Sequence, residues 1–283
     1  VCAGNCAGMG VRYDGTGTST ATITISNSTF DRIDTVGVSA STTGTNNPLL
    51  TLNVLNNTFA GQTYVSNNPD NSERAIFVPF TSGNGVITTR IEGNTITNHA
   101  NPNFGVIELN NAENQRLNAT IRGNNIPFYS PIGRNISIYH QVDSGYTGLL
   151  IASIENNTLA GGNTGAISAT GTGAGVSENN VTITTNQIAN APGFGFRAVS
   201  SELFSGNFSS TMCNNISGNA INAAPERAIN IVGVIGAGQV RLQGMSGTGD
   251  ANAITYLQAN NSVTGAVFVN TGNSITSATC RTP

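Results

Sequence analysis

The stretch Ile91-Glu92-Gly93-Asn94-Thr95-Ile96 decides the fold, because variants of this six-residue phrase recur along the chain. Each copy has an apolar residue at both ends and, in its fourth position, a small or turn-forming residue that is usually Asn. Other copies begin at Val54, Ile121, Ile154 and Ile183, and two looser ones, which match the pattern only in part, begin at Ile25 and Thr211. The fourth residues fall at positions 28, 57, 94, 124, 157, 186 and 214, in steps of 29, 37, 30, 33, 29 and 28. A near-constant period of this size is typical of stacked repeats.

Alternating β-branched residues precede the phrase, as in Thr22-Ile23-Thr24-Ile25 and Val181-Thr182-Ile183. Such alternation indicates a strand with one buried face. The Gly-Asn or Asn-Asn pair that follows favours a sharp corner, since both residue types tolerate a left-handed backbone.

A second set of strands is predicted to begin 8 to 18 residues after each fourth position. It covers residues 36–38, 75–78, 105–109, 135–138, 166–168, 197–199 and 228–231. The spacer before these strands varies in length, which places the variable loops along one edge of the stack. We therefore predict an all-β parallel β-solenoid of about eight coils of roughly 30 residues, with little or no helix.

The single domain of 283 residues divides by pattern into three parts. Residues 1–19 are expected to form an N-terminal edge or cap, residues 20–239 the regular coils, and residues 240–283 degenerate final coils with a C-terminal cap. Within this last part, we expect the final strands at 253–257 and 266–269.

Stacking predicts contacts between coils. The fourth-position residues should superpose as a structural ladder of amides: Asn57, Asn94, Asn124, Asn157, Asn186 and Asn214. The second positions Glu92, Arg122 and Glu155 should alternate in charge up one outer face.

The composition limits the partners. Only 9% of residues are charged, all eleven basic residues are Arg, and the net charge is −3. These values give no basic field for nucleic acid, and no apolar stretch is long enough to span a membrane. Since the chain begins at Val1 without Met, we expect it to be part of a longer precursor.

Four cysteines, Cys2, Cys6, Cys213 and Cys280, allow three pairings. We favour Cys213–Cys280, closing the last coils, with Cys2–Cys6 as a local loop; free thiols are the alternative. Disulfides would indicate an extracellular or cell-surface location.

The seven phrases resemble the repeats of right-handed parallel β-helix proteins of the pectate-lyase-like superfamily, over residues 20 to about 235. The segment from Cys213-Asn214-Asn215-Ile216-Ser217-Gly218-Asn219 to Cys280 resembles the closing part of large secreted bacterial surface or adhesin-like proteins of this type. The resemblance implies a right-handed β-helix and the same Cys213–Cys280 pairing.

No catalytic or metal-binding residue is predicted. Polysaccharide-cleaving members of this superfamily use clustered Asp residues, whereas of the six Asp residues here only Asp31 and Asp34 are close in sequence. A pair of Asp34 with Asp70 or Glu73 would need distant loops. We expect no cofactor, although residues 67–73 carry oxygen ligands that calcium prefers. His99 and His140 are expected in or near solvent-exposed loops. Tyr129, Tyr139 and Tyr146 are the best candidates for stacking on a glycan.

The sequence thus favours an extracellular structural or adhesive rod, without an evident catalytic site, over an enzyme. Its expected partner is a glycan, another cell-surface ligand or further copies of itself. A polysaccharide lyase or hydrolase acting on an acidic glycan is the alternative, followed by a self-assembling surface filament. Ice binding through a Thr-rich face ranks last, because the coils do not keep Thr in register.

Overall fold

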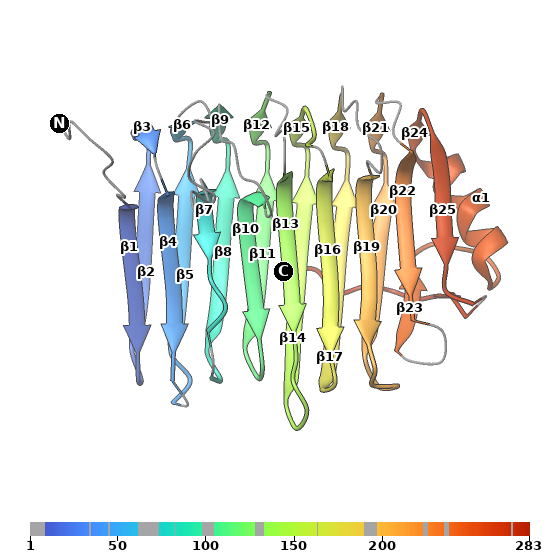
Figure 1. The fold of residues 1–283 in the computed structure, drawn as a ribbon, viewed down its shortest axis with the longest axis horizontal. Coiled ribbons are helices and arrows are strands. Elements are labelled where there is room, and N and C mark those ends of the chain that lie inside the picture. Colours follow the sequence, from blue (N-terminus) through green and yellow to red (C-terminus); the bar gives the residue numbers. More distant parts are fainter. Residues whose placement is uncertain are drawn as a thin grey trace, which may run out of the picture.

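The fold is a parallel β-solenoid in which three sheets run along one rod (Figure 1). The computed structural model describes residues 9–33, 35–44, 46–61, 74–81, 83–97, 105–127, 133–162, 164–189, 197–222, 226–234, 238–272 and 274–283. Each sheet takes every third strand of the chain, and every pairing is parallel, as the repeating phrase predicts.

The strands are grouped here by sheet. Sheet A contains β1 (Met9–Thr16), β4 (Val36–Thr43), β7 (Arg74–Val78), β10 (Gly105–Ala112), β13 (Arg134–Gln141), β16 (Gly165–Gly173), β19 (Arg197–Ser205), β22 (Arg227–Gly233) and β25 (Ala266–Asn270). Sheet B contains β2 (Thr20–Ser26), β5 (Leu49–Leu55), β8 (Val86–Glu92), β11 (Arg116–Arg122), β14 (Thr147–Glu155), β17 (Val176–Thr184), β20 (Thr211–Ser217), β23 (Gln239–Leu242) and β26 (Thr276–Ser277). Sheet C contains β3 (Thr29–Ile33), β6 (Thr58–Gly61), β9 (Thr95–Thr97), β12 (Asn125–Ile126), β15 (Thr158–Leu159), β18 (Gln187–Ile188), β21 (Ala220–Ile221) and β24 (Ser262–Val263).

About seven turns are regular, against the eight expected. The difference arises because helix α1 (Asp250–Asn260) lies between β23 and β24 and interrupts the next turn. The prediction of a strand at 253–257 is therefore wrong. Ala253 and Leu257 are instead buried helix residues, four positions apart on one face, and α1 lies against the end of the stack beside β25 (Figure 1).

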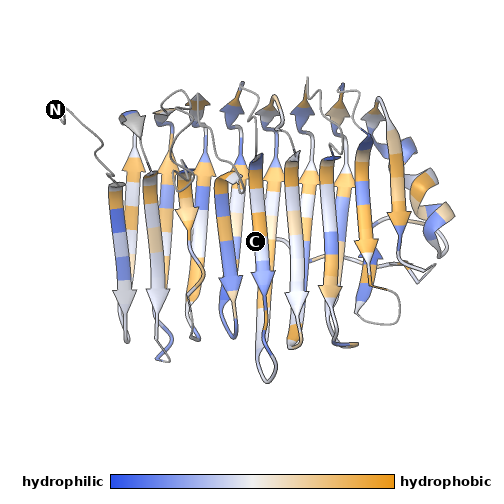
Figure 2. Ribbon diagram, in the orientation of Figure 1, coloured by the Kyte–Doolittle hydropathy of each residue, from blue (hydrophilic) through white to orange (hydrophobic). Residues whose placement is uncertain are grey.

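The core consists of aliphatic columns that run along the rod axis. The first apolar residue of each phrase stacks on its counterpart in the next turn: Ile25, Val54, Ile91, Ile121, Ile154, Ile183 and Ile216. All except Ile25 are fully buried. Figure 2 shows the resulting hydrophobic bands, which lie at matching heights on neighbouring strands. Each turn therefore buries its apolar face only when another turn lies on it.

The corner between sheets B and C requires a left-handed residue in each regular turn. The residues with positive φ just before the fourth position are Asn27, Asn56, Gly93, Gly123, Asn156, Thr185 and Gly218, with φ between 50° and 67°. Gly and Asn adopt this conformation at little cost, whereas a β-branched residue does not. Thr185, with φ 56°, is the strained member of the series.

Directly after this bend, buried asparagines form a continuous ladder. From Asn94 onward, each side-chain oxygen accepts two hydrogen bonds from the Asn of the preceding turn, one from its backbone N–H and one from its Nδ2, whereas the oxygen of Asn57 accepts one from the backbone N–H of Ser28. At Asn94 and Asn124, for example, these distances are 3.0 and 2.9 Å. The ladder contains Asn57, Asn94, Asn124, Asn157, Asn186, Asn219 and Asn261. The Nδ2 groups also donate to strand carbonyls of the turn before, so these buried amides are satisfied.

Asn214 is not part of this ladder, contrary to the prediction. It pairs in sheet B with Val181, and its side-chain oxygen accepts a hydrogen bond from Ser201. The ladder position is Asn219, five residues later, in the phrase Ile216-Ser217-Gly218-Asn219-Ala220-Ile221. The two final steps of the period are therefore 33 and 42 residues, and the longer one accommodates α1.

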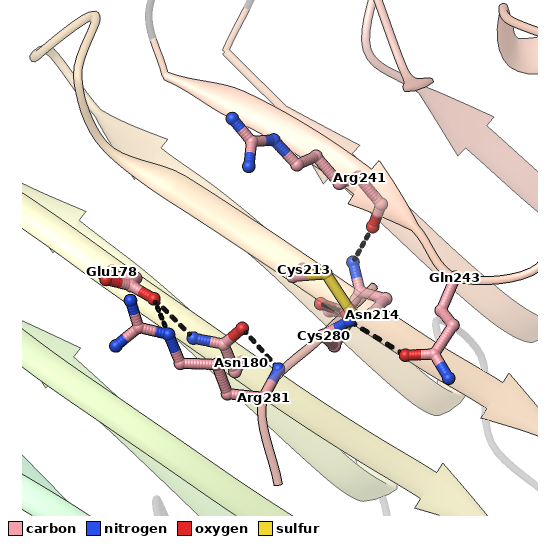
Figure 3. The surroundings of a disulfide bond; sticks show 9 residues. Glu178, Asn180, Cys213, Asn214, Arg241, Gln243, Cys280 and Arg281 are labelled. Carbon is pink, nitrogen blue, oxygen red and sulfur yellow. Dashed lines mark hydrogen bonds and ion pairs between the residues drawn. A yellow bond between two sulfur atoms is a disulfide. The ribbon is translucent and has the colours of Figure 1, made fainter. Parts of the chain in front are cut away.

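The structure joins Cys213 to Cys280, the pairing that the sequence favoured. Cys2 and Cys6 lie outside the described residues. The disulfide closes a stretch of 67 residues, which is worth about 4 kcal/mol in a chain-entropy estimate. It fastens residues 278–283, called the strap below, to the outer face of sheet B (Figure 3).

His140 is buried inside β13, so its expected exposure in a loop is wrong. Its Nδ1 lies 2.7 Å from Oδ1 of Asn179, whose Nδ2 donates to Ser177 and Thr211. We therefore assign the ring proton to Nδ1. Among the described residues, none forms a hydrogen bond with Nε2. Burial lowers the pKa of His140 to about 4, against a smaller opposing effect of the Asn179 hydrogen bond.

Replacing one ladder residue tests how much the amides stabilise the fold. Asn124→Ala should lower the free energy of unfolding by about 3 kcal/mol, because it leaves two buried donors of Asn94 without their acceptor. Asn125→Ala, at the neighbouring exposed position, is the matched control and should cost under about 1 kcal/mol. Urea unfolding measures both, and equal losses would contradict the ladder's contribution.

Relieving the left-handed strain should stabilise the protein. Thr185→Asn should raise the free energy of unfolding by about 1 kcal/mol, because Asn occupies the same bend at positions 56 and 156. Thermal unfolding should show a higher midpoint temperature for this variant. The control Thr184→Asn, in the adjoining strand, should show no such increase. A decrease for Thr185→Asn would argue against strain at this bend.

Acid should destabilise the folded state through His140. In the folded state the pKa of His140 lies below its ordinary value of 6.5. The contribution of neutral His140 to the free energy of unfolding is therefore complete above pH 6.5 and is lost as the pH falls towards 4. Over that window the loss approaches about 3 kcal/mol. His140→Asn should flatten this part of the stability profile measured by urea unfolding, because Asn111 occupies the equivalent position one turn earlier. An unchanged slope would contradict this assignment.

Candidate functional site

The outer face of sheet A carries a continuous polar surface whose side chains are largely withdrawn from solvent. One row along this face reads Ser39, Phe77, Glu108, Ser137, Ser168, Ser200 and Asn230. Strand alternation points these residues away from the aliphatic core. Glu108 and Asn230 are nevertheless only 3% and 0% exposed, so their polar atoms depend on partners within the protein.

Four arginines occupy equivalent positions at the start of sheet A strands: Arg74, Arg134, Arg197 and Arg227. Three of them have counter-charges or hydrogen-bond acceptors. Arg74 pairs with Glu108 and lies 4.2 Å from the centre of the Phe77 ring. Arg197 pairs with Glu202 at 2.5 Å, and Arg227 donates to Asn230 at 2.8 Å.

Arg134 differs from these three arginines. It is half-buried, its Nε has no hydrogen-bond partner, and no ion pair within the described residues includes it. Burial lowers the pKa of its guanidinium from the ordinary value, and the nearby charge of Arg197 adds to the shift, while Glu202 and Glu108 oppose it. A guanidinium in this position lacks the acceptor that burial normally demands.

Arg134 lines a groove of about 340 Å³ on this face. The groove, called the sheet A groove, is lined by Phe80, Glu108, Asn110, Arg134, Ser137, Tyr139 and Gln141. The rings of Phe80 and Tyr139 meet edge to face, 5.4 Å between centroids, and Phe80 is 45% exposed. Aromatic faces beside amide, hydroxyl and guanidinium groups can bind the apolar faces and the oxygens of a sugar.

The carboxylates of this face are widely separated. Glu108 and Glu202 lie three turns apart, which corresponds to roughly 14 Å at the spacing of neighbouring strands. Glycoside cleavage uses two carboxyl groups about 5 to 10 Å apart. Glu108 is also committed to Arg74 and to Nδ2 of Asn110, the latter at 2.8 Å. No group of three or more potential metal ligands occurs among the described residues.

The predicted site residues separate in the structure. Tyr139 lines the sheet A groove, whereas Tyr146, 38% exposed, lies in the turn between β13 and β14 and does not line it. Asp31 lies in β3, away from this face. Several other candidates fall outside the described residues: Tyr129, Asp34, Asp70, Glu73, His99 and the proposed calcium ligands of residues 67–73.

Sequence reasoning missed Phe80, Glu108 and Arg134. Arg74 and Arg227 carried a signal, because both begin second strands, and alignment of these strands would have added Arg134 and Arg197. The partner of Arg74 could not be read from its neighbours, since Glu108 belongs to the next turn. Phe80 follows the end of β7 and shares no repeat position with another aromatic residue.

The fold and groove define the chain as a β-solenoid repeat protein with a polar, partly aromatic face. Comparison with known proteins gave no matching family model, curated protein or solved structure. Within the described ranges, no helix has the length and apolar character to cross a membrane.

Proposed function

We propose that the protein is an extracellular adhesive rod that binds an acidic glycan in the sheet A groove. The observation that carries this proposal is Arg134, a half-buried guanidinium that faces a groove without a counter-charge of its own. A carboxylate on the ligand would supply the missing acceptor and remove the cost of burying an unpaired charge.

The rest of the groove fits a sugar. Phe80 and Tyr139 offer ring surface, while Asn110, Ser137 and Gln141 offer hydrogen-bonding groups. Because neighbouring turns are about 4.8 Å apart, a chain of sugars laid along the rod would meet a new set of side chains with each turn. Repeated contacts of this kind raise the affinity of individually weak sites.

An adhesive role is favoured over cleavage by the positions of the carboxylates. A lyase or hydrolase acting on the same acidic glycan remains the second candidate, as the resemblance to pectate-lyase-like β-helix proteins implies. It would need a second acidic group near Glu108, and the nearest ones on this face among the described residues, Asp14 and Glu202, are each three turns away, or roughly 14 Å. A filament subunit is the third candidate, since strand edges at a rod end can pair with another copy.

An extracellular location is supported by the Cys213–Cys280 disulfide, which an oxidising compartment would maintain. The same disulfide and the Cys-Asn-Asn-Ile-Ser-Gly-Asn sequence support kinship with the closing segment of secreted bacterial surface proteins. In that setting the rod would present its polar face to a polysaccharide outside the cell.

Binding of oligogalacturonate, a polymer with one carboxylate per sugar, tests the proposal by isothermal titration calorimetry. We expect binding without new reducing ends or unsaturated products, and no binding of neutral dextran. Arg134→Gln should weaken binding roughly tenfold or more, because a charge-assisted hydrogen bond is lost. Arg116→Gln, an exposed arginine of sheet B, is the matched control and should bind as the original protein does.

Three results would contradict the proposal. Turnover of the polymer would favour the lyase or hydrolase. If the Arg134→Gln variant bound oligogalacturonate as tightly as the original protein, the binding site would not be the sheet A groove. Absence of binding to any acidic polysaccharide in a panel of plant and bacterial polymers would contradict glycan adhesion.

A further inference from the structure

A second cavity lies on sheet B, where the strap crosses the outer face of the rod. After β26 the chain turns back along the rod, and its C-terminus lies near the middle of the molecule (Figure 1). The strap is held at three described points besides the disulfide. Cys280 N–H donates to Gln243, Arg281 N–H donates to Asn180, and the Arg281 side chain pairs with Glu178 at 3.1 Å (Figure 3).

The cavity has a volume of about 360 Å³ and is built from both the sheet and the strap. Its sheet side includes the hydroxyl group of Thr147 in β14 and, two turns further along, those of Ser209, just before β20, and Thr211, at the start of β20. The strap contributes Thr279 and Arg281. The cavity is partly open to solvent, and one of its walls exists only while the strap lies against the sheet.

The charges around this cavity do not balance. It is lined by two guanidinium groups, Arg241 and Arg281, and by one carboxylate, Glu178. Glu178 is occupied by Arg281 and by Nδ2 of Asn180 at 3.1 Å. Arg241 is half-buried and donates only to the neutral side chain of Gln239, at 2.8 Å, among the contacts that the described residues make. One positive charge thus remains for an anion.

We propose that the strap and sheet B form a pocket for a monosaccharide acid, and that the Cys213–Cys280 disulfide holds this pocket together. The carboxylate of the ligand pairs with Arg241, and the surrounding hydroxyl side chains bond the sugar hydroxyls. The volume matches the lower end of the range for small-molecule sites. The site is independent of the sheet A groove, which lies on another face of the rod.

The disulfide is required because the other contacts of the strap are weak. The Arg281–Glu178 pair has side chains 60% and 38% exposed, and exposed ion pairs contribute little. Two backbone hydrogen bonds remain, both near the surface. Without the covalent link, the strap would leave the sheet for much of the time and Arg241 would face open solvent.

Saturation-transfer NMR with glucuronate as the probe tests the pocket. The experiment is run in the Arg134→Gln background, in which the sheet A groove binds acidic sugars at least roughly tenfold more weakly, and we expect this parent protein to give a clear signal from the strap pocket. Arg241→Gln should reduce the affinity roughly tenfold or more through loss of a charge-assisted hydrogen bond. Arg281→Gln should also weaken binding, because Glu178 then neutralises Arg241 instead of Arg281. Cys213→Ser with Cys280→Ser should abolish the signal while circular dichroism still reports a β fold.

Two further probes separate the ligand chemistries. Glucose should give no signal, since it lacks the carboxylate, and acetate should bind at least tenfold more weakly than glucuronate, since it lacks the hydroxyls. Equal binding of glucose or acetate would overturn the assignment to a sugar acid. In the Arg134→Gln background, an unchanged glucuronate affinity after Arg241→Gln, or after the double Cys→Ser change in a folded protein, would overturn the proposed pocket. If the double variant is unfolded, the two Arg variants, which keep the disulfide, decide the question alone.

Discussion

The hydrogen bonds between stacked asparagine side chains are the constraint on which the rest of the structure depends. A side-chain oxygen such as that of Asn124 accepts both donors of the turn below, so each amide fixes the position of the next turn. These amides are buried, and a shift of one residue would leave several of them without partners. The aliphatic columns provide most of the driving force for stacking, but apolar contacts alone would tolerate slippage along a strand.

A fixed register gives the outer faces their order. Because Arg74, Arg134, Arg197 and Arg227 begin equivalent strands, their guanidinium groups recur along one face of the rod. Three of these guanidinium groups have a carboxylate or an amide acceptor within the protein, and the fourth faces the sheet A groove. On sheet B the same register brings Glu178 and Arg241 close enough for the strap to lie across both. The two proposed sites thus lie where the repeat pattern is broken. One is at Arg134, which among the described residues lacks the partner that the other three arginines have, and the other is at the strap, which has no counterpart in the repeats.

The repeated phrase was sufficient to predict parallel strands, the corner and most of the ladder, because these features depend on residues close in sequence. Asn214 was misassigned since its step of 28 matched the average period, although Gly218-Asn219 has the glycine that the bend prefers. Helix α1 escaped prediction because its short sequence has only two buried residues. The sheet A groove could not be foreseen, since Phe80, which follows β7, meets Arg134 and Tyr139 of β13 only after β7, β10 and β13 have been aligned.

Native-state hydrogen exchange of the ladder amides tests the central claim most directly. The backbone N–H groups of Asn94, Asn124, Asn157 and Asn186 donate to side-chain oxygens of the following turn. They should therefore exchange as slowly as the central strands of sheet B, through global unfolding. Exchange at the rate of exposed turns, with the flanking strands still protected, would show that the asparagines do not hold the turns together.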